Sequence, residues 1–595
     1  MHLSLSSLAR QLKGSVVIFL VGAGLILLQI SFLGKSLLFN LPSYGLIATA
    51  FIVTFATLKR RLAADVLCLL ATAAFGIFVV VRALTSPFPY FARPDLYCAI
   101  AGLLLYTITV TFLGSSTRRI GLIFLLLAFS VYHVLVGLVQ FGVGENFISL
   151  PFFKNITVTK RATGLYANPD HLAGLLEALG IFGLSIACWA RRPRVVRVFA
   201  GYLALACYIG LALTASRGGY LSGAVSLIVF AILSGLALYS GSDPVFRIYR
   251  RVALVIAVVA VVGIGFGIGQ SVRLRERVAS MLSPEGTRFD LWRAAITQWQ
   301  LQPIVGTGSG TYRFYGREFR VPRMQADPVM VHNDYLHLLC EYGLIGGALF
   351  CFFLTAHLRA GWKTFSYYGP QRLAAGTAPL SDRFALTMGA LSILAAYAVH
   401  SVFDFNLHLP ANALLVAFAF GILAYPGETR ASNEDAHGAD ITLRFAGIAF
   451  GLFVFWRCLR LFPGEYFAER SRISLENEEP ETAVILARKA LAYEQRNPTI
   501  FFQLGRGLEA LAEKSDEPEK RRNNLQAALE AFDHARALAP LDGTHPLDMA
   551  FVYDKMGRYN EAEWMYGLAL ARDPNSETML HLYQSHLDLW RSAGK

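Results

Sequence analysis

Charged residues are scarce in this sequence, and their scarcity excludes most kinds of soluble protein. Only 16% of the 595 residues are Asp, Glu, Lys or Arg, against about 25% in a typical soluble domain. Hydrophobic residues make up 55%. A soluble core cannot bury so much apolar surface, so lipid must be the solvent for most of the chain. The composition therefore excludes a disordered chain, a fibrous repeat and an ordinary cytosolic enzyme.

Paired cysteines are also missing. The seven cysteines are scattered, none forms a Cys-x-x-Cys pair, and all fall in or beside apolar runs. This pattern indicates cysteines that are buried as small hydrophobic residues, and not a disulfide framework or a metal site. The formal net charge of +13 favours an anionic partner. Membrane headgroups satisfy that preference, so we expect no nucleic acid partner.

Thirteen apolar runs have the character of membrane-spanning helices. About 20 apolar residues cross the hydrocarbon layer, and a helix satisfies the backbone groups that lipid cannot. We expect an all-α polytopic membrane protein with 12 or 13 transmembrane helices. The runs lie near residues 15–34, 37–58, 64–82, 95–114, 120–141, 171–190, 197–216, 218–239, 252–270, 335–357, 384–404, 410–426 and 442–461. The last is the weakest, because Arg444 and Arg457 bound its uncharged stretch and would have to snorkel.

The basic residues of the loops predict how the chain is oriented. Alternate loops are rich in Arg and Lys, as around Arg60, Arg118 and Arg192, and we expect these loops to be cytoplasmic. The opposite loops are poor in basic residues, except for the long outer loop, residues 271–334, which carries nine arginines. Long loops cross regardless of charge. These arginines either face lipid phosphates or clamp a phosphate-bearing substrate, for which the guanidinium fork is suited.

From about residue 465 the sequence becomes charged and alanine-rich, which indicates a soluble part. One helix–turn–helix pattern ends at Pro540 and a second at Pro574, 34 residues later, and this is the tetratricopeptide period. A looser copy ends at Pro498, with extra residues inserted around 513–522. We expect a C-terminal α-helical array of about three tetratricopeptide-type repeats, with an unrelated helical bundle as the alternative.

The change of composition divides the chain into a transmembrane domain, residues 1–464, and a repeat domain, residues 465–595. Repeat arrays build concave surfaces for peptides or proteins and perform no chemistry themselves, so the array can recruit a protein partner. Its side of the membrane depends on the thirteenth span. We favour a real span and an array on the outer side; without that span the array is cytoplasmic.

Three groups of residues that can carry chemistry fall on the expected outer side, at 161–171, 214–219 and 286–336. Within the second group, Arg217 is the only charged residue between Arg197 and Asp243. A lone arginine at that depth is costly unless it faces a cavity or a partner. The alternative is an arginine that snorkels to the interface, although the two glycines after it favour a close backbone approach.

The third group contains a histidine suited to proton transfer. Residues 306–310 are glycine-rich, but no strand precedes them and no Lys-Ser/Thr follows, so a nucleotide loop is not favoured. His332 stands beside Asn333 and Asp334 where the chain re-enters the membrane. A lone histidine is usually structural. In a loop of arginines, however, a general-base role becomes plausible.

Together these motifs resemble the O-antigen ligase-like family of bacterial membrane glycosyltransferases, which includes O-antigen ligases, polysaccharide polymerases and O-linked protein oligosaccharyltransferases. The resemblance covers roughly residues 15–425. The matching residues are Ser216 to Gly219, Arg288 with Trp292, Pro303 to Gly310, His332 with Asn333 and Tyr335, and Arg161 with Gly164, Asn168 and Pro169. Asp170 departs from the family, which more often has Asn there.

The resemblance implies transfer of a glycan from undecaprenyl pyrophosphate to an acceptor hydroxyl, on the periplasmic face of the bacterial inner membrane, without a nucleotide or metal cofactor. It implies catalytic roles for His332, Arg217 and Arg288, and substrate binding by Arg161, Asn168, Trp292, Asn333 and Tyr335. Physical chemistry agrees, because fixed guanidiniums stabilise the charge that a pyrophosphate leaving group gains. The outer loops contain no Asp-x-Asp motif that would suit a metal-dependent enzyme.

Five further residues are ambiguous. Glu177 and Glu341 lie inside expected spans, where acids are functional candidates by default. We expect each of them equally to pair with the outer arginines or to act as a catalyst. His400, Asp404 and His408 cluster near an outer turn, and we expect them to be structural or to support the site.

The acceptor is a glycolipid in a ligase, which is the preferred reading, a growing glycan in a polymerase, or a protein in an oligosaccharyltransferase. The repeat array gives the last some support, because it could present a protein. A transporter of lipid-linked glycans would have charges spread through its spans and repeated groups of spans, and neither is evident. A non-catalytic scaffold would leave the outer motifs unexplained.

Overall fold

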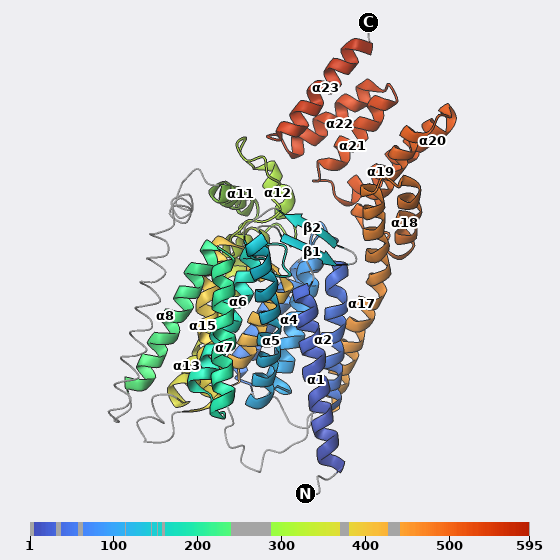
Figure 1. Ribbon diagram of the computed structural model, residues 1–595. Coiled ribbons are helices and arrows are strands. Elements are labelled where there is room, and N and C mark those ends of the chain that lie inside the picture. Colours follow the sequence, from blue (N-terminus) through green and yellow to red (C-terminus); the bar gives the residue numbers. More distant parts are fainter. Residues whose placement is uncertain are drawn as a thin grey trace.

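The computed structural model describes most of the chain. The described residues are 5–30, 37–57, 64–113, 115–143, 146–150, 153–157, 161–239, 287–368, 380–425 and 441–593. The expected span near 252–270 and the first part of the long outer loop lie outside this set. Figure 1 shows a bundle of long helices with a smaller helical array at one end.

Apolar helices make up the bundle. They are α1 (Leu5–Ile30), α2 (Leu37–Thr57), α3 (Val66–Leu84), α4 (Arg93–Thr111), α5 (Ser116–Val143), α6 (Pro169–Trp189), α7 (Arg194–Leu213), α8 (Arg217–Tyr239), α13 (Asp334–Tyr368), α15 (Asp382–Phe403) and α16 (Pro410–Leu423), joined by α17 (Ile441–Glu476). Ten of the described helices are long and apolar enough to cross a membrane, whereas Ser15–Ile30 and α16 are shorter apolar helices. The protein is an all-α polytopic membrane protein, as the sequence predicts.

Helices α6 and α15 form the centre of the bundle. In their most apolar windows 83% and 72% of the residues are buried, because small residues let neighbouring helices approach closely. A Cβ atom added at Gly389 of α15 would lie 2.6 Å from Phe182 of α6. The two most enclosed helices therefore hold any side chain at their ends in a fixed position.

Pairings between the basic loops place them at one end of the bundle. Arg192 pairs with Asp382 at 2.8 Å, and Arg359 pairs with Asp65 at 2.7 Å. These loops belong to the set expected on the cytoplasmic side. The opposite end carries the hairpin β1 (Asn146–Leu150) and β2 (Phe153–Thr157), with α11 (Thr287–Leu301) and α12 (Tyr312–Glu318) (Figure 1). The sequence did not predict this short hairpin.

The weakest expected span is a helix that runs from the bundle into the array. Helix α17 is 36 residues long and packs along α2. Its glycines Gly447 and Gly451 lie against Phe55 and Ile52, and the Arg444 guanidinium donates to the carbonyl of Ala56 at 2.8 Å. The expected domain boundary at 464/465 falls inside this helix, and the domain limits remain a prediction.

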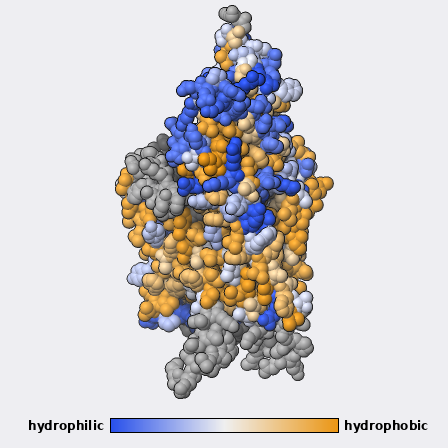
Figure 2. Space-filling view, turned by 90° about the vertical axis from the view of Figure 1, so that its right-hand side faces the viewer, coloured by the Kyte–Doolittle hydropathy of each residue, from blue (hydrophilic) through white to orange (hydrophobic). Residues whose placement is uncertain are grey.

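The array is α-helical, as the sequence predicts. Its helices are α18 (Pro480–Tyr493), α19 (Pro498–Lys514), α20 (Pro518–Leu538), α21 (Thr544–Lys555), α22 (Tyr559–Arg572) and α23 (Glu577–Ala593). Proline begins three of them, because its fixed φ suits the first helical turn. The residues expected as an insertion lengthen α20, which has 21 residues. Figure 2 shows the hydrophilic surface of the array beside the apolar surface of the bundle.

Buried ion pairs fasten the array to the long outer loop. The Arg320 guanidinium donates to both oxygens of Asp573 at 2.7 Å, and both side chains are almost fully buried. Arg317 reaches Asp542 at 3.1 Å, and the Asn575 amide donates to the carbonyl of Arg320 at 2.7 Å. Some arginines of this loop therefore neither face lipid phosphates nor clamp a substrate, since their partners are carboxylates of the array.

Replacing Arg320 with alanine is expected to loosen the array from the loop. The change leaves Asp573 buried without its partner, and breaking such a pair costs about 3–5 kcal/mol. Hydrogen exchange of the full-length protein should accelerate in α22, α23 and the loop around 317–327. As a control, Arg293→Ala removes a guanidinium that is 63% exposed and should change little. Unchanged exchange in Arg320→Ala would show that the pair does not hold the array.

Candidate active site

His332 is held in an unusual backbone conformation between α12 and α13. Its φ of 53° lies in the left-handed region, which is costly for a residue with a side chain and persists only when the surroundings impose it. The Trp292 indole N–H donates to the carbonyl of His332 at 3.4 Å. The Phe405 ring meets the imidazole edge-on, with centroids 4.7 Å apart. The side chain remains 32% exposed, so a substrate can reach it.

Asp404 faces His332 from the end of α15. Its Oδ1 lies 3.3 Å from His332 Nδ1, and its side chain is only 3% exposed. Burial alone raises the pKa of this carboxyl, but the hydrogen bond from His332 and the nearby His171 and His400 outweigh it, so the pKa lies well below its usual range. An ionised Asp404 favours a proton on the Nδ1 of His332 that faces it, which leaves Nε2 as the acceptor.

A second buried layer supports Asp404. His400 Nδ1 lies 2.9 Å from Glu177 Oε1, and both side chains are fully buried. The Ser222 hydroxyl donates to Glu177. These contacts join α6, α8 and α15. Glu177 therefore holds His400 in place one turn before Asp404, and this contact accounts for an acid inside the bundle.

Arg161 joins two of the three groups singled out in the sequence. Its Nε donates to the carbonyl of Thr214 at 2.8 Å, and its Nη2 donates to Asp170 at 2.7 Å. Gln140 accepts from the backbone N–H groups of Thr163 and Gly164, both at 2.9 Å, and so fixes the loop. Asp170, which departs from the family pattern, thus has a defined partner.

Arg217 is the first residue of α8, directly after the turn that Arg161 contacts. The positive end of the helix dipole adds to its charge. A Cβ added at Gly218 would lie 3.4 Å from the His400 ring, and one added at Gly219 would lie 2.6 Å from Ala173. The glycines therefore permit the close backbone approach that the sequence suggested. They bring the start of α8 against His400 and Ala173.

Arg288 lies on the first turn of α11, one turn before Trp292. Its Nη1 is buried and has no hydrogen-bond partner among the described residues. A buried guanidinium donor without a partner costs free energy, and an anion at this position would remove that cost. Because Trp292 contacts the backbone of His332, Arg288 and His332 belong to one neighbourhood.

The other residues expected to bind substrate make structural contacts. Asn168 caps α6 by accepting from Asp170 N at 2.8 Å. Asn333 caps α13 by accepting from the backbone N–H groups of Tyr335 and Leu336, both at 3.0 Å. The Tyr335 hydroxyl donates to the carbonyl of Ala398 at 2.8 Å. These contacts position the helix ends around His332, and a direct role in substrate binding remains a prediction.

Asp334, which the sequence did not single out as a site residue, organises the far side of the same loop. Its carboxylate accepts from the Ser401 hydroxyl at 2.8 Å and lies 2.8 Å from His408 Nδ1. His408 in turn stacks on His337, with centroids 4.1 Å apart. The loop between α15 and α16 therefore makes two contacts with the segment around His332. Asp404 contacts His332, and His408 contacts Asp334.

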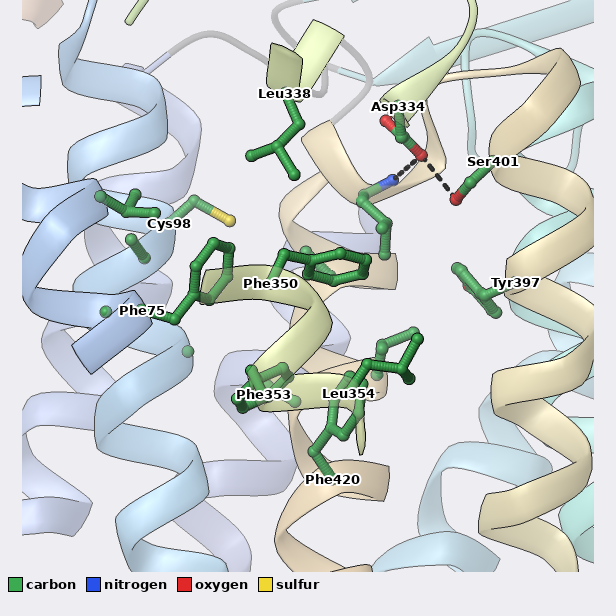
Figure 3. Close-up of a pocket in the computed structure, with 18 of the residues that line it drawn as sticks. Phe75, Cys98, Asp334, Leu338, Phe350, Phe353, Leu354, Tyr397, Ser401 and Phe420 are labelled. Atoms are coloured by element: carbon green, nitrogen blue, oxygen red, sulfur yellow. Dashed lines mark hydrogen bonds between the residues drawn. The ribbon is translucent and has the colours of Figure 1, made fainter. Parts of the chain in front are cut away.

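An apolar cavity of about 310 Å³ borders Asp334. Figure 3 shows Phe75, Phe350, Phe353 and Phe420 around it, with Asp334 at one end. A cavity with this lining suits a hydrocarbon chain.

The glycine-rich stretch 306–310 packs against the protein itself. Gly306 and Gly310 both have a φ of 74°. A Cβ at Gly306 would lie 2.3 Å from the backbone of Glu341, and Glu341 accepts from Gly310 N at 2.8 Å. The stretch therefore fixes α11 and α12 against α13, a role that differs from that of a nucleotide loop.

Comparison with known proteins finds a family match in the centre of the chain. Residues 202–351 match the family model described as O-antigen ligase, a stretch that includes Arg217, Arg288 and His332. No curated protein matches the chain. Among solved structures, a thermophilic TPR protein of Thermus thermophilus is 23% identical over 25% of this chain and 81% of that chain, with a TM-score of 0.20.

Proposed function

We propose that this membrane protein, whose residues 202–351 match the O-antigen ligase family model, transfers a glycan from undecaprenyl pyrophosphate to an acceptor hydroxyl. The family supports a glycan-transfer or polymerase-type function, and hence a glycosyltransferase-type enzyme with a lipid-linked glycan donor. One observation carries the finer proposal: an accessible histidine, His332, faces the buried carboxylate of Asp404 at 3.3 Å.

The arginines account for the donor. A pyrophosphate leaving group gains negative charge as the glycosidic bond to it breaks, and preorganised guanidiniums stabilise that charge. Arg288 offers a buried N–H without a partner among the described residues, and Arg217 adds the start of a helix. Arg161 is held by Asp170 and fixes the turn before Arg217. The leaving group therefore departs as a stabilised diphosphate, and no metal ion is needed.

His332 accounts for the acceptor. With its Nδ1 turned to Asp404, the Nε2 lone pair can accept the proton of a sugar hydroxyl as that hydroxyl attacks the anomeric carbon. The imidazolium that forms is stabilised by the ionised carboxylate. Phe405 packs against the imidazole ring and Trp292 holds the backbone of His332, so the base needs no reorientation during the step.

The proposal includes a place in the cell. The pairing of the basic loops at one end of the bundle supports an active site on the other, periplasmic face of the bacterial inner membrane. The array contacts the outer loop and would then also be periplasmic. A ligase acting on a glycolipid is the preferred form. A polymerase uses the same chemistry, and so does an oligosaccharyltransferase acting on a protein that the array presents.

A transfer assay tests the proposed function. The full-length protein in lipid nanodiscs is incubated with an undecaprenyl-pyrophosphate-linked glycan and an acceptor glycolipid, and the products are analysed by mass spectrometry. We expect a new glycosidic bond, release of undecaprenyl pyrophosphate and no effect of a chelator. A transporter would move the donor without forming this bond. Absence of any transfer product across ligase, polymerase and protein acceptors would refute the proposal.

A further inference from the structure

Two cavities meet beside the candidate active site. The apolar cavity of Figure 3 lies among α3, α4, α13, α15 and α16. A second cavity, of about 260 Å³, lies between the outer end of the bundle and the first helices of the array. Asp95 and His408 line both cavities. The two spaces therefore adjoin, and together they form one compartment with an apolar half and a polar half.

The apolar half suits a hydrocarbon chain. Its lining contains no Lys, Arg or Glu, and its carboxylates, Asp95 and Asp334, lie toward the polar half. Ala398 is exposed, and Leu338 and Phe350 are partly exposed, so the cavity reaches the surface of the bundle that faces lipid. An alkyl chain entering from the membrane would bury apolar area on both partners.

The polar half suits a saccharide better than a phosphate. Arg93 and Arg313 are balanced by three carboxylates, Asp95, Glu341 and Glu465, and the rings of Tyr90 and Phe91 complete the lining. Sugar hydroxyls both donate and accept hydrogen bonds, and sugar C–H faces pack on aromatic rings. A pyrophosphate would face the carboxylates here. The excess positive charge that a pyrophosphate needs lies instead at Arg217 and Arg288.

Four buried polar atoms at this half have no hydrogen-bond partner among the described residues: Nη1 of Arg93, Nε of Arg313, Nδ1 of His337 and Oε1 of Glu465. His337 and Glu465 are more than nine-tenths buried, and Glu465 Oε1 lies 3.9 Å from Arg93 Nη1, beyond hydrogen-bond distance. Such atoms are uncommon in folded proteins because each carries a desolvation cost. Sugar hydroxyls both donate and accept hydrogen bonds, so a bound sugar would satisfy the two guanidinium donors as well as His337 and Glu465.

We propose that the joined cavities are the acceptor site and that the acceptor is a lipid-linked saccharide. Its chain occupies the apolar cavity, and its first sugars occupy the polar cavity beneath the array. Val329 and Met330 line the polar half and Asp334 lines the apolar half, so His332 lies on the segment between them. The inference rests on the proposed function, and it selects a glycolipid over a protein as the acceptor.

Photolabelling tests this site without requiring transfer. The probe is hexadecyl maltoside with a diazirine in its chain, added to the full-length protein in nanodiscs. We expect labelled peptides from α3, α4 and α13. Gly102→Leu should lower labelling at least ten-fold, because a Cβ there would meet only Ala417, at 3.8 Å, and the larger side chain would fill the cavity. Ala417→Leu, from the facing helix α16, should act in the same way.

Matched controls separate the chain from the sugar. Gly121→Leu should leave labelling unchanged, because a Cβ at Gly121 has no atom within 4 Å and Gly121 lies outside both cavities. A hexadecyl phosphate probe of the same chain length should label at least five-fold less. Arg313→Gln should weaken labelling by the maltoside, whereas the exposed Arg293→Gln should not.

Three outcomes would overturn the inference: full labelling of Gly102→Leu and Ala417→Leu, equal labelling by the phosphate probe, or displacement of the maltoside by undecaprenyl phosphate, which would assign the cavity to the donor. Labelling as expected in a protein that transfers nothing would refute the proposed function and leave the glycolipid site standing. Transfer without labelling would refute the glycolipid site and leave the proposed function standing.

Discussion

His332→Ala is expected to lower the rate of glycan transfer by about 10²–10⁴, the usual contribution of a general base. The reason is geometric: His332 is exposed to substrate on one side and held by Asp404 at 3.3 Å on the other. The rate is measured under saturating donor and acceptor, so that a change in affinity is not mistaken for a change in chemistry. The exposed His581→Ala, in the array, is the control and should transfer at the normal rate.

Asp404→Asn tests the same dyad through its pH dependence. Because the pKa of Asp404 lies below its usual range, the carboxylate contributes its charge at neutral pH and loses it only when the pH falls below that of an ordinary aspartate. Asp404→Asn should therefore transfer more slowly than the wild type at every pH from about 5 to about 9. A ratio of wild-type to variant rate that collapses to one within this range would show that Asp404 does not act as a fixed anion.

Arg288→Ala is the second variant with a large expected effect, a loss of about 10²–10³ in kcat by analogy with other electrostatic donors. Its Nη1 has no hydrogen-bond partner among the described residues, so this donor can bind the leaving group. Arg288→Lys should recover only part of the rate, because an ammonium lacks the planar fork that matches a phosphate.

Arg293→Ala is the matched control on the same helix, since that guanidinium is 63% exposed. The KM for the donor and kcat should be measured separately. A clamp that acts mainly in the transition state lowers kcat more than it raises KM. An Arg288→Ala variant with a normal kcat would remove this residue from the mechanism.

Hydrophobic runs were a reliable guide to the bundle because a lipid solvent constrains composition strongly. Even the weak thirteenth span is present as α17, with Arg444 satisfied by a backbone carbonyl. The repeat period likewise predicted the array, because each helix pair is a local unit. The hairpin between α5 and α6 was missed, since two five-residue strands leave little periodic signal in a polar loop.

The site was only partly predictable. Arg217 was singled out because a lone charge beside glycines in an apolar stretch has to be explained. Asp404 was considered but not chosen, because nothing in the sequence links it to His332 across 71 intervening residues. Asn333 was assigned to substrate, although an Asn directly before a helix is a familiar cap. The pairing of Arg320 with Asp573 was not predicted, because Asp573 lies in another part of the chain.

Helix α17 belongs to both the bundle and the array, and this sets how far the array stands from the membrane. A helix of 36 residues is about 54 Å long, and the Arg320–Asp573 pair braces the array at a second point. A molecule bound by the array would thus be held at a fixed distance and orientation relative to His332. Such tethering raises the effective concentration of a captured molecule, so the array would govern how often substrates arrive while leaving bond formation itself to the helices below.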